Sequence, residues 1–304
     1  MHLIVPFAAP LSEAGRHALQ TLKLPHLDAL LTRMTMAWRD DGDALSFSPP
    51  HERAEARALG LAGADGELPW GALRATQDGV DTDGLAWGLL TPVHWEVGSD
   101  HVRLTDPDAL ALDDAGSRSF FEAVQPLFES EGLLLVYGAP LRWYVAHESL
   151  TELATASLDR VIGRHLDNWL PSGPNARLMR RLQNEVQMLL YTHELNEQRE
   201  ARGELPVNSF WLSGCGLHQP VKQGVALQVD DRLRTPALSE DWARWAEAWR
   251  QLDASLAVQS TRPASLVLCG ERTAVQFDTR ERSLWQRLQG TLRGASAIAL
   301  LETL

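Results

Sequence analysis

The chain has 304 residues and a formal net charge of −12, from 28 Lys and Arg against 40 Asp and Glu. Its 44% hydrophobic and 22% charged residues exclude bulk disorder, and the length predicts one or two globular domains at about 150 residues each. The acidic balance argues against a general nucleic-acid binder, because such affinity depends largely on cations that neutralise phosphates.

The cysteines and the N-terminal residues bear on the compartment. Cys215 and Cys269 are too few for a disulfide framework or a four-cysteine zinc site. The apolar run 1–7 is too short for a signal sequence and lacks a cationic start. No apolar run approaches the roughly 18–20 residues that span a membrane. We therefore expect a cytoplasmic protein without a membrane partner.

The first half of the chain alternates short apolar runs with periodic segments. In chain order these predict a strand at 2–7, helices at 12–22, 24–34 and 48–60, strands at 87–92 and 94–97, a helix at 117–131, and a hairpin of 132–138 with 142–146. Ser12 is suited to cap the first helix, Pro25 to begin the second, and Gly60 to end the third.

The second half continues in the same way. It predicts helices at 154–169 and 175–202, a strand at 207–212 with a loop at 213–216, a helix at 239–252, strands at 264–269 and 274–277, and a helix at 281–292. Trp242, Trp245 and Trp249 share one face of the 239–252 helix, a spacing typical of a buried face. A protein-contact surface is the alternative.

Alternating strands and helices predict an α/β fold with a mixed, largely parallel sheet flanked by helices. A change in composition near 147–151 places a boundary between an N-terminal lobe, 1–148, and a C-terminal lobe, 149–304. One continuous domain is the alternative.

Cys215 and two histidines are the candidates for reactive chemistry. Cys215 lies between Gly214 and Gly216 after a strand, where backbone N–H groups could surround an anion or lower the thiol pKa. The alternative is a small residue in a tight turn. His94 and His101 are weak metal-ligand candidates, because such residues more often form hydrogen bonds at a sheet edge. We expect no bound metal and no cofactor.

Polar side chains gather between residues 159 and 208. The long predicted helix carries a polar stripe that is separate from the apolar one, made of Arg180, Asn184, Gln187 and Tyr191. This stripe is either an anion site or a solvated helix face. The predicted ligand-binding residues are Arg180, Asn184, Gln187, His193, Arg199, Asn208, Ser213, Gly214, Cys215 and Gly216.

Several of these segments together resemble a known family. The run from Arg177-Leu-Met-Arg-Arg-Leu-Gln-Asn-Glu-Val to Asn208-Ser-Phe-Trp-Leu-Ser-Gly-Cys-Gly216 resembles bacterial regulatory proteins of the RpfE type. Proteins of that type are often described as predicted cofactor-independent phosphoglycerate mutases. The segments Pro49-Pro-His-Glu-Arg53, Thr91-Pro-Val-His-Trp95 and Leu158-Asp-Arg-Val-Ile-Gly163 fit the same family.

The Asn-x-x-Trp-x-x-Gly-x-Gly pattern at 208–216 is also similar to archaeal-type cofactor-independent phosphoglycerate mutases. That resemblance implies an alkaline-phosphatase-like scaffold with two divalent metals and a Ser or Thr nucleophile. The opening strand here ends Pro6-Phe-Ala-Ala-Pro10, with no carboxylate or serine, and no histidine follows His218. Because a two-metal site needs several carboxylate and imidazole ligands, we expect the two-metal site to be missing from a decayed scaffold.

These observations favour a cytoplasmic regulatory protein that binds a small anionic or phosphorylated metabolite. An enzyme acting on phosphorylated small molecules, of phosphomutase or phosphatase type, is the alternative, and we do not expect it to be an active phosphoglycerate mutase. A protein-interaction module is the second alternative, with a protein partner or a homo-oligomer.

Overall fold

The computed structural model describes residues 1–98, 102–258, 263–279 and 296–304. They form two compact units. The first unit is built from Met1–Gly60 together with Lys222–Leu304, and the second unit is Leu61–Val221. The boundary predicted between 148 and 149 falls inside the unit Leu61–Val221. Strand pairing explains the difference, because strands from both sides of that point share one sheet.

The first unit contains a five-stranded mixed sheet in the order β2-β11-β10-β1-β9. Its strands are β1 (His2–Ala9), β2 (Met34–Asp41), β9 (Leu227–Val229), β10 (Ser265–Gly270) and β11 (Thr273–Thr279). β1 runs parallel to both β9 and β10, whereas β11 is antiparallel to β10 and β2. The carboxyl ends of β1, β2 and β10 therefore meet at one edge of the sheet.

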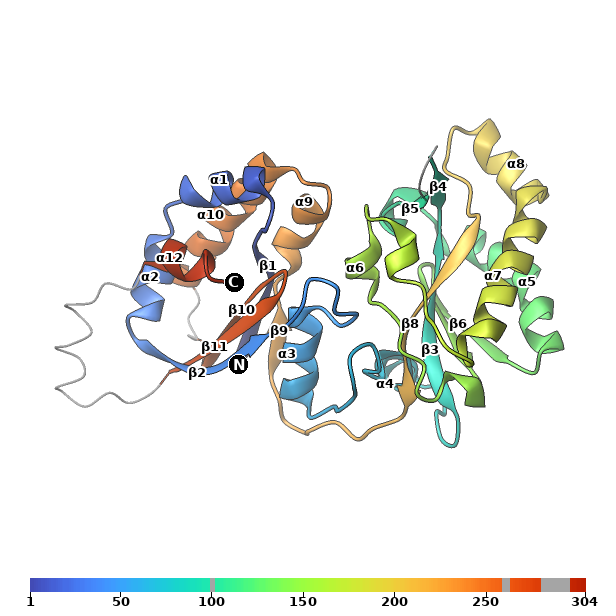
Figure 1. Ribbon diagram of the computed structural model, residues 1–304, viewed down its shortest axis with the longest axis horizontal. Coiled ribbons are helices and arrows are strands. Elements are labelled where there is room, and N and C mark those ends of the chain that lie inside the picture. The colour runs from blue at the N-terminus through green and yellow to red at the C-terminus, as the bar shows by residue number, and fades with distance from the viewer. Residues whose placement is uncertain (99–101, 259–262, 280–295) are drawn as a thin grey trace. The chain divides into compact units, whose positions relative to one another are not determined.

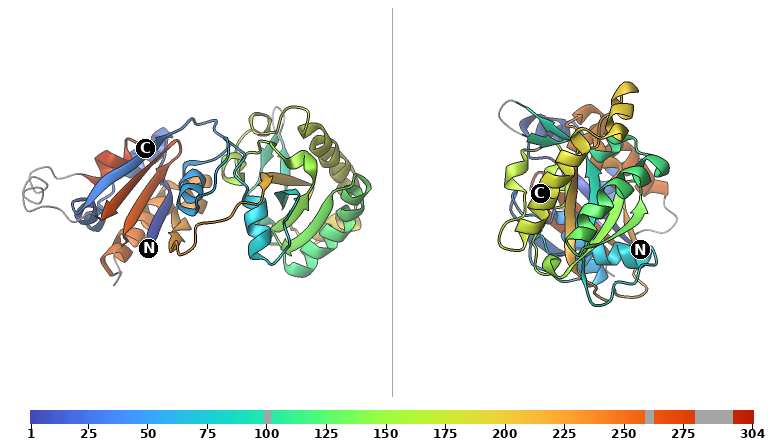
Figure 2. Two further views of the ribbon diagram at one scale, coloured as in Figure 1. Left: turned by 90° about the horizontal axis from the view of Figure 1, so that it is seen from below. Right: turned by 90° about the vertical axis from the view of Figure 1, so that its right-hand side faces the viewer.

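Helices cover both faces of this sheet (Figures 1 and 2). They are α1 (Glu13–Gln20), α2 (Pro25–Leu31), α3 (Pro50–Leu59), α9 (Arg234–Leu238), α10 (Trp242–Val258) and α12 (Ala297–Leu301). Alternation along β10 divides the core, since Leu266 and Leu268 join the cluster under α10 and Val267 joins the one under α3. The predicted caps are confirmed: Ser12 accepts from the Gly15 N–H, and Gly60 ends α3 with a φ of 80°.

The tryptophan face of α10 is part of the core. Trp245 and Trp249 are completely buried, and Trp242 is partly buried against the same cluster. The expectation of a buried face is therefore confirmed.

The second unit contains an antiparallel four-stranded sheet in the order β6-β7-β3-β8 and a two-stranded ribbon of β4 with β5. The strands are β3 (Ala86–Val93), β4 (Trp95–Val97), β5 (Val102–Leu104), β6 (Leu134–Ala139), β7 (Arg142–Ala146) and β8 (Ser209–Leu217). The mixed α/β class is confirmed. A largely parallel sheet is not, because parallel pairs occur only beside β1 among the described strands.

Helices also flank this second sheet on two faces (Figures 1 and 2). They are α4 (Trp70–Gln77), α5 (Asp114–Ser130), α6 (Leu158–Val161), α7 (Ala176–Tyr191) and α8 (Glu194–Ala201). Alternation along β7 again assigns the faces: Trp143 and Val145 pack with α5 and α7, and Tyr144 packs with α4.

Three predicted helices need comment. The helix predicted at 175–202 is two helices, because His193 leaves the helical conformation and caps α8 by accepting from the Leu195 N–H. The helix predicted at 154–169 is wrong, since only α6 and a short 3-10 turn at Leu166–Asn168 form there. The helix predicted at 281–292 lies outside the described residues. No helix within the described ranges is long and apolar enough to cross a membrane.

Candidate functional site

The predicted cleft at 213–216 is not formed. These residues continue β8 rather than forming a loop, and Ser213, Gly214 and Cys215 are buried. The glycines make room for α4 instead of a ligand, since a Cβ on Gly214 would lie 2.7 Å from the Trp70 Cβ. Burial also raises the pKa of the Cys215 thiol to about 12, the opposite of what a nucleophile requires.

The polar stripe of α7 touches β8 only through Gln187, at the start of the strand and away from 213–216. Arg180 donates from Nε and Nη2 to the Pro171 carbonyl, at 3.1 and 2.7 Å, and so closes a local turn. Asn184 is exposed. Gln187 reaches the Ser209 hydroxyl at 3.4 Å. This face of α7 is therefore a solvated helix side with two structural contacts, one to the Pro171 turn and one to β8.

The remaining predicted ligand residues have structural roles. Arg199 is 5% exposed and donates to the carbonyls of Leu110 and Leu205. Burial lowers the pKa of its guanidinium. Asn208 exchanges two hydrogen bonds with the Trp95 backbone, at 2.7 and 2.9 Å, and so fixes β4 beside β8.

The two histidines give no metal site among the described residues. Nδ1 of His94 lies 2.9 Å from the Pro206 carbonyl, which matches the expected hydrogen-bonded role. His101 lies outside the described residues. Within 1–98, 102–258, 263–279 and 296–304, no three His, Cys, Asp or Glu side chains are grouped to hold a metal ion.

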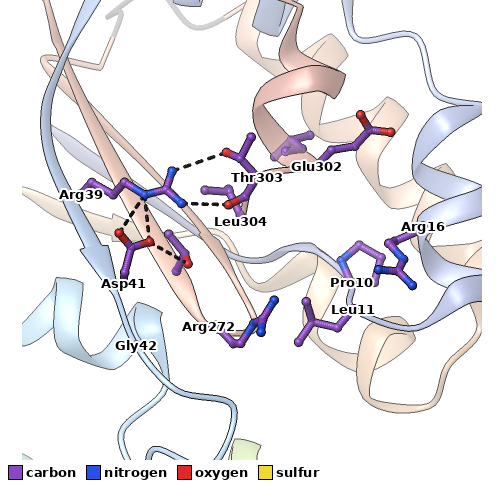
Figure 3. A pocket seen from close by; sticks show the side chains of 12 residues that line it. Pro10, Leu11, Arg16, Arg39, Asp41, Gly42, Arg272, Glu302, Thr303 and Leu304 are labelled. Atoms are coloured by element: carbon purple, nitrogen blue, oxygen red, sulfur yellow. Dashed lines mark hydrogen bonds and ion pairs between the residues drawn. The ribbon is translucent and has the colours of Figure 1, made fainter.

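A pocket of about 350 Å³ lies in the first unit, at the edge where the strand ends meet. Pro10 and Leu11 line it directly after β1, and Gly42 directly after β2. Arg272 contributes from the turn between β10 and β11, and Glu302 from the turn after α12 (Figure 3). Ligands of open α/β sheets bind outside the carboxyl ends of parallel strands, so this pocket is the candidate site.

Three arginines give the pocket its charge. Arg16 enters from α1, Arg39 from β2 and Arg272 from the β10–β11 turn. The side chains of Arg16 and Arg272 make no hydrogen bond or ion pair with any described residue. Two unpaired guanidinium groups in one pocket can bind a carboxylate or phosphate through paired N–H donors.

Arg39 is already engaged. Its Nε donates to the Asp41 carboxylate at 2.8 and 3.1 Å, and its Nη2 donates to the Thr303 carbonyl at 2.9 Å (Figure 3). Thr273 also donates to Asp41, at 3.2 Å. Arg39 therefore joins β2 to the residues that follow α12, and holds one wall of the pocket in place.

The sequence predictions missed this pocket. Its residues lie far apart along the chain, from Pro10 to Leu304, and only the sheet order brings them together. One signal was available: Pro10 and Leu11 directly follow the buried strand predicted first, and the carboxyl end of such a strand is a common ligand position.

A second pocket, of about 410 Å³, lies in the second unit between the start of α5 and α8. Its arginines are already paired. Arg199 lies 3.2 Å from the Glu204 carboxylate, and Arg202 lies 2.8 Å from the same group. Because these charges are neutralised locally, this pocket is a weaker anion site than the first.

Comparisons with known proteins add little. No family model and no curated protein matches the chain. A cofactor-independent phosphoglycerate mutase from Thermoplasma acidophilum is 13% identical, over 99% of this chain and 98% of that chain, with a TM-score of 0.37. The PH0037 protein from Pyrococcus horikoshii is 12% identical, over 99% and 96%, with a TM-score of 0.46. Neither likeness carries an argument about what this chain does, and the RpfE-type resemblance stays a prediction.

Proposed function

We propose that this protein binds a small anionic metabolite in the pocket lined by Arg16, Arg39 and Arg272, and that it acts as a regulatory protein. One observation carries the proposal: Arg16 and Arg272 share this pocket without a partner among the described residues. The binding part of the proposal rests on this pocket, and the regulatory part rests on the sequence resemblance.

The charge of the whole chain strengthens this reading. With a net charge of −12, the chain repels anions on average, so an anion site needs a local group of positive side chains. The five charged side chains that line the pocket are three arginines, Asp41 and Glu302, and their formal charges sum to +1. A concave positive site raises the local concentration of anions by focusing the field.

Titration calorimetry with inorganic phosphate and with sulfate tests the proposal. We expect binding that weakens as salt rises, because salt screens exposed charges. Arg272→Ala should weaken it about tenfold or more, since a hydrogen bond to a charged group contributes about 1.5–3 kcal/mol. Arg33→Ala is the matched control, because Arg33 is also exposed in this unit but lies outside the pocket. Equal binding by the two variants would exclude the pocket.

A further inference from the structure

The same pocket holds an unpaired carboxylate. Glu302 lines it, is exposed, and makes no ion pair with any described residue. Its one hydrogen bond among the described residues is to a neutral group: Oε1 accepts from the Gln20 side-chain amide at 3.0 Å. Asp41 differs, because Arg39 and Thr273 already occupy its oxygens.

The unpaired charges of the pocket are therefore two guanidinium groups, Arg16 and Arg272, and one carboxylate, Glu302. In Figure 3 the two guanidinium groups lie on either side of Leu11, and the Glu302 carboxylate lies on the same side as Arg16. A ligand with an anionic group alone would satisfy the arginines and be repelled by Glu302. A ligand that also carries an ammonium group would satisfy all three, because charge-assisted hydrogen bonds to ions are the strong ones.

We infer that the ligand is a small molecule with an anionic group and a primary ammonium group, the first bound by Arg16 and Arg272 and the second by Glu302. This inference rests on the proposed function, since it needs the arginine pocket to bind anions. The size agrees, because about 350 Å³ is near the lower end of the roughly 300–1,000 Å³ found for small-molecule sites. A phosphate monoester and a dicarboxylate are the two sources of the anionic group.

Calorimetry with matched ligand pairs separates these possibilities. Phosphoethanolamine against 2-hydroxyethyl phosphate changes only the ammonium to a hydroxyl on a phosphate, and aspartate against malate does so on a dicarboxylate. We expect the ammonium member of at least one pair to bind about tenfold more tightly. The pair that shows the preference identifies the anionic group.

Glu302→Gln gives the decisive result, because one substitution should act in opposite directions. It should weaken the binding of the ammonium ligand about tenfold and strengthen the binding of inorganic phosphate, since the carboxylate that repels anions is removed. The Gln side chain can still accept the bond from Gln20, so the local fold is kept. Glu13→Gln is the control: it removes an exposed carboxylate from α1, outside the pocket.

The failures are distinguishable. Suppose that inorganic phosphate binds and that Arg272→Ala weakens this binding. If Glu302→Gln then changes the affinities of both ligands of a pair equally, the inference is overturned and the proposed function stands. If inorganic phosphate does not bind at all, both are overturned.

Discussion

The indole Nε1 of Trp245 donates a hydrogen bond to the Phe7 carbonyl over 2.9 Å, and Phe7 has a left-handed backbone with a φ of 55°. The strand β1 has a bulge here. Between the paired residues Val5–Leu268 and Ala9–Gly270, three residues of β1 lie opposite a single residue of β10. This bulge leaves the Phe7 carbonyl outside the ladder, and Trp249 holds the Ala8 carbonyl in the same way, at 3.2 Å. The two tryptophans therefore fix the bulge that leads into the pocket.

Trp245→Ala should lower the free energy of unfolding by roughly 3–5 kcal/mol, because a large buried side chain leaves a cavity. Trp245→Phe should cost less, about 1–3 kcal/mol, from the smaller ring and from the partly buried Phe7 carbonyl that loses its donor. Denaturant unfolding measures both. Trp242→Ala is the control, and should cost less than Trp245→Ala because Trp242 is only partly buried. A Trp245→Ala protein of unchanged stability would contradict the core assignment.

Local patterns predicted most elements of the fold, because burial and capping act over a few residues. Ser12 and Gly60 mark helix ends in the sequence and do so in the structure. His193 shows the limit: it fits the helical spacing of 175–202, yet its imidazole caps α8 and divides the segment. The strand β2 was missed, because its buried and exposed residues do not alternate regularly along its length.

The predicted site failed for a reason of topology. The sequence pattern predicts a strand at 207–212 with a ligand site at its carboxyl end, whereas β8 runs from Ser209 to Leu217 and includes the predicted site. That rule concerns parallel strands, whereas β8 is antiparallel to β3. The order of strands depends on pairings between distant segments, such as β1 with β10, which no local pattern specifies.

Gly214→Ala should destabilise the protein by about 2–4 kcal/mol. A side chain there is strained by a φ of +63° and would overpack α4, whose Trp70 Cβ lies 2.7 Å from the new Cβ. Gly132→Ala is a matched control, because its φ is +77° but nothing lies within 4 Å of a Cβ. It should cost only about 1–2 kcal/mol, from the backbone strain. Thermal unfolding of both variants measures the difference, and equal losses would mean that β8 and α4 are not packed this closely.

Stability should fall at alkaline pH because of Tyr144. Burial, together with its hydrogen bond to Asp78 at 2.5 Å, raises the pKa of the Tyr144 hydroxyl from its usual 10.0 to about 12. Between these values the folded protein keeps a proton that the unfolded chain releases, so unfolding becomes easier as pH rises. The stabilisation from the protonated Tyr144 hydroxyl is complete below pH 10 and is lost by about pH 12. A shift of this size contributes no more than about 3 kcal/mol to the free energy of unfolding.

Denaturant unfolding at a series of pH values from 9 to about 12 tests this dependence. Tyr144→Phe removes the titrating hydroxyl, so its stability should decline less steeply with pH than that of the unmodified protein. Tyr191→Phe is the control, because Tyr191 is 84% exposed and should leave the slope unchanged. Burial also raises the pKa values of Tyr137, Cys215 and Cys269, so part of the alkaline loss of stability remains in both variants. If Tyr144→Phe and the unmodified protein lose stability in parallel, the Tyr144–Asp78 contact does not contribute in this way.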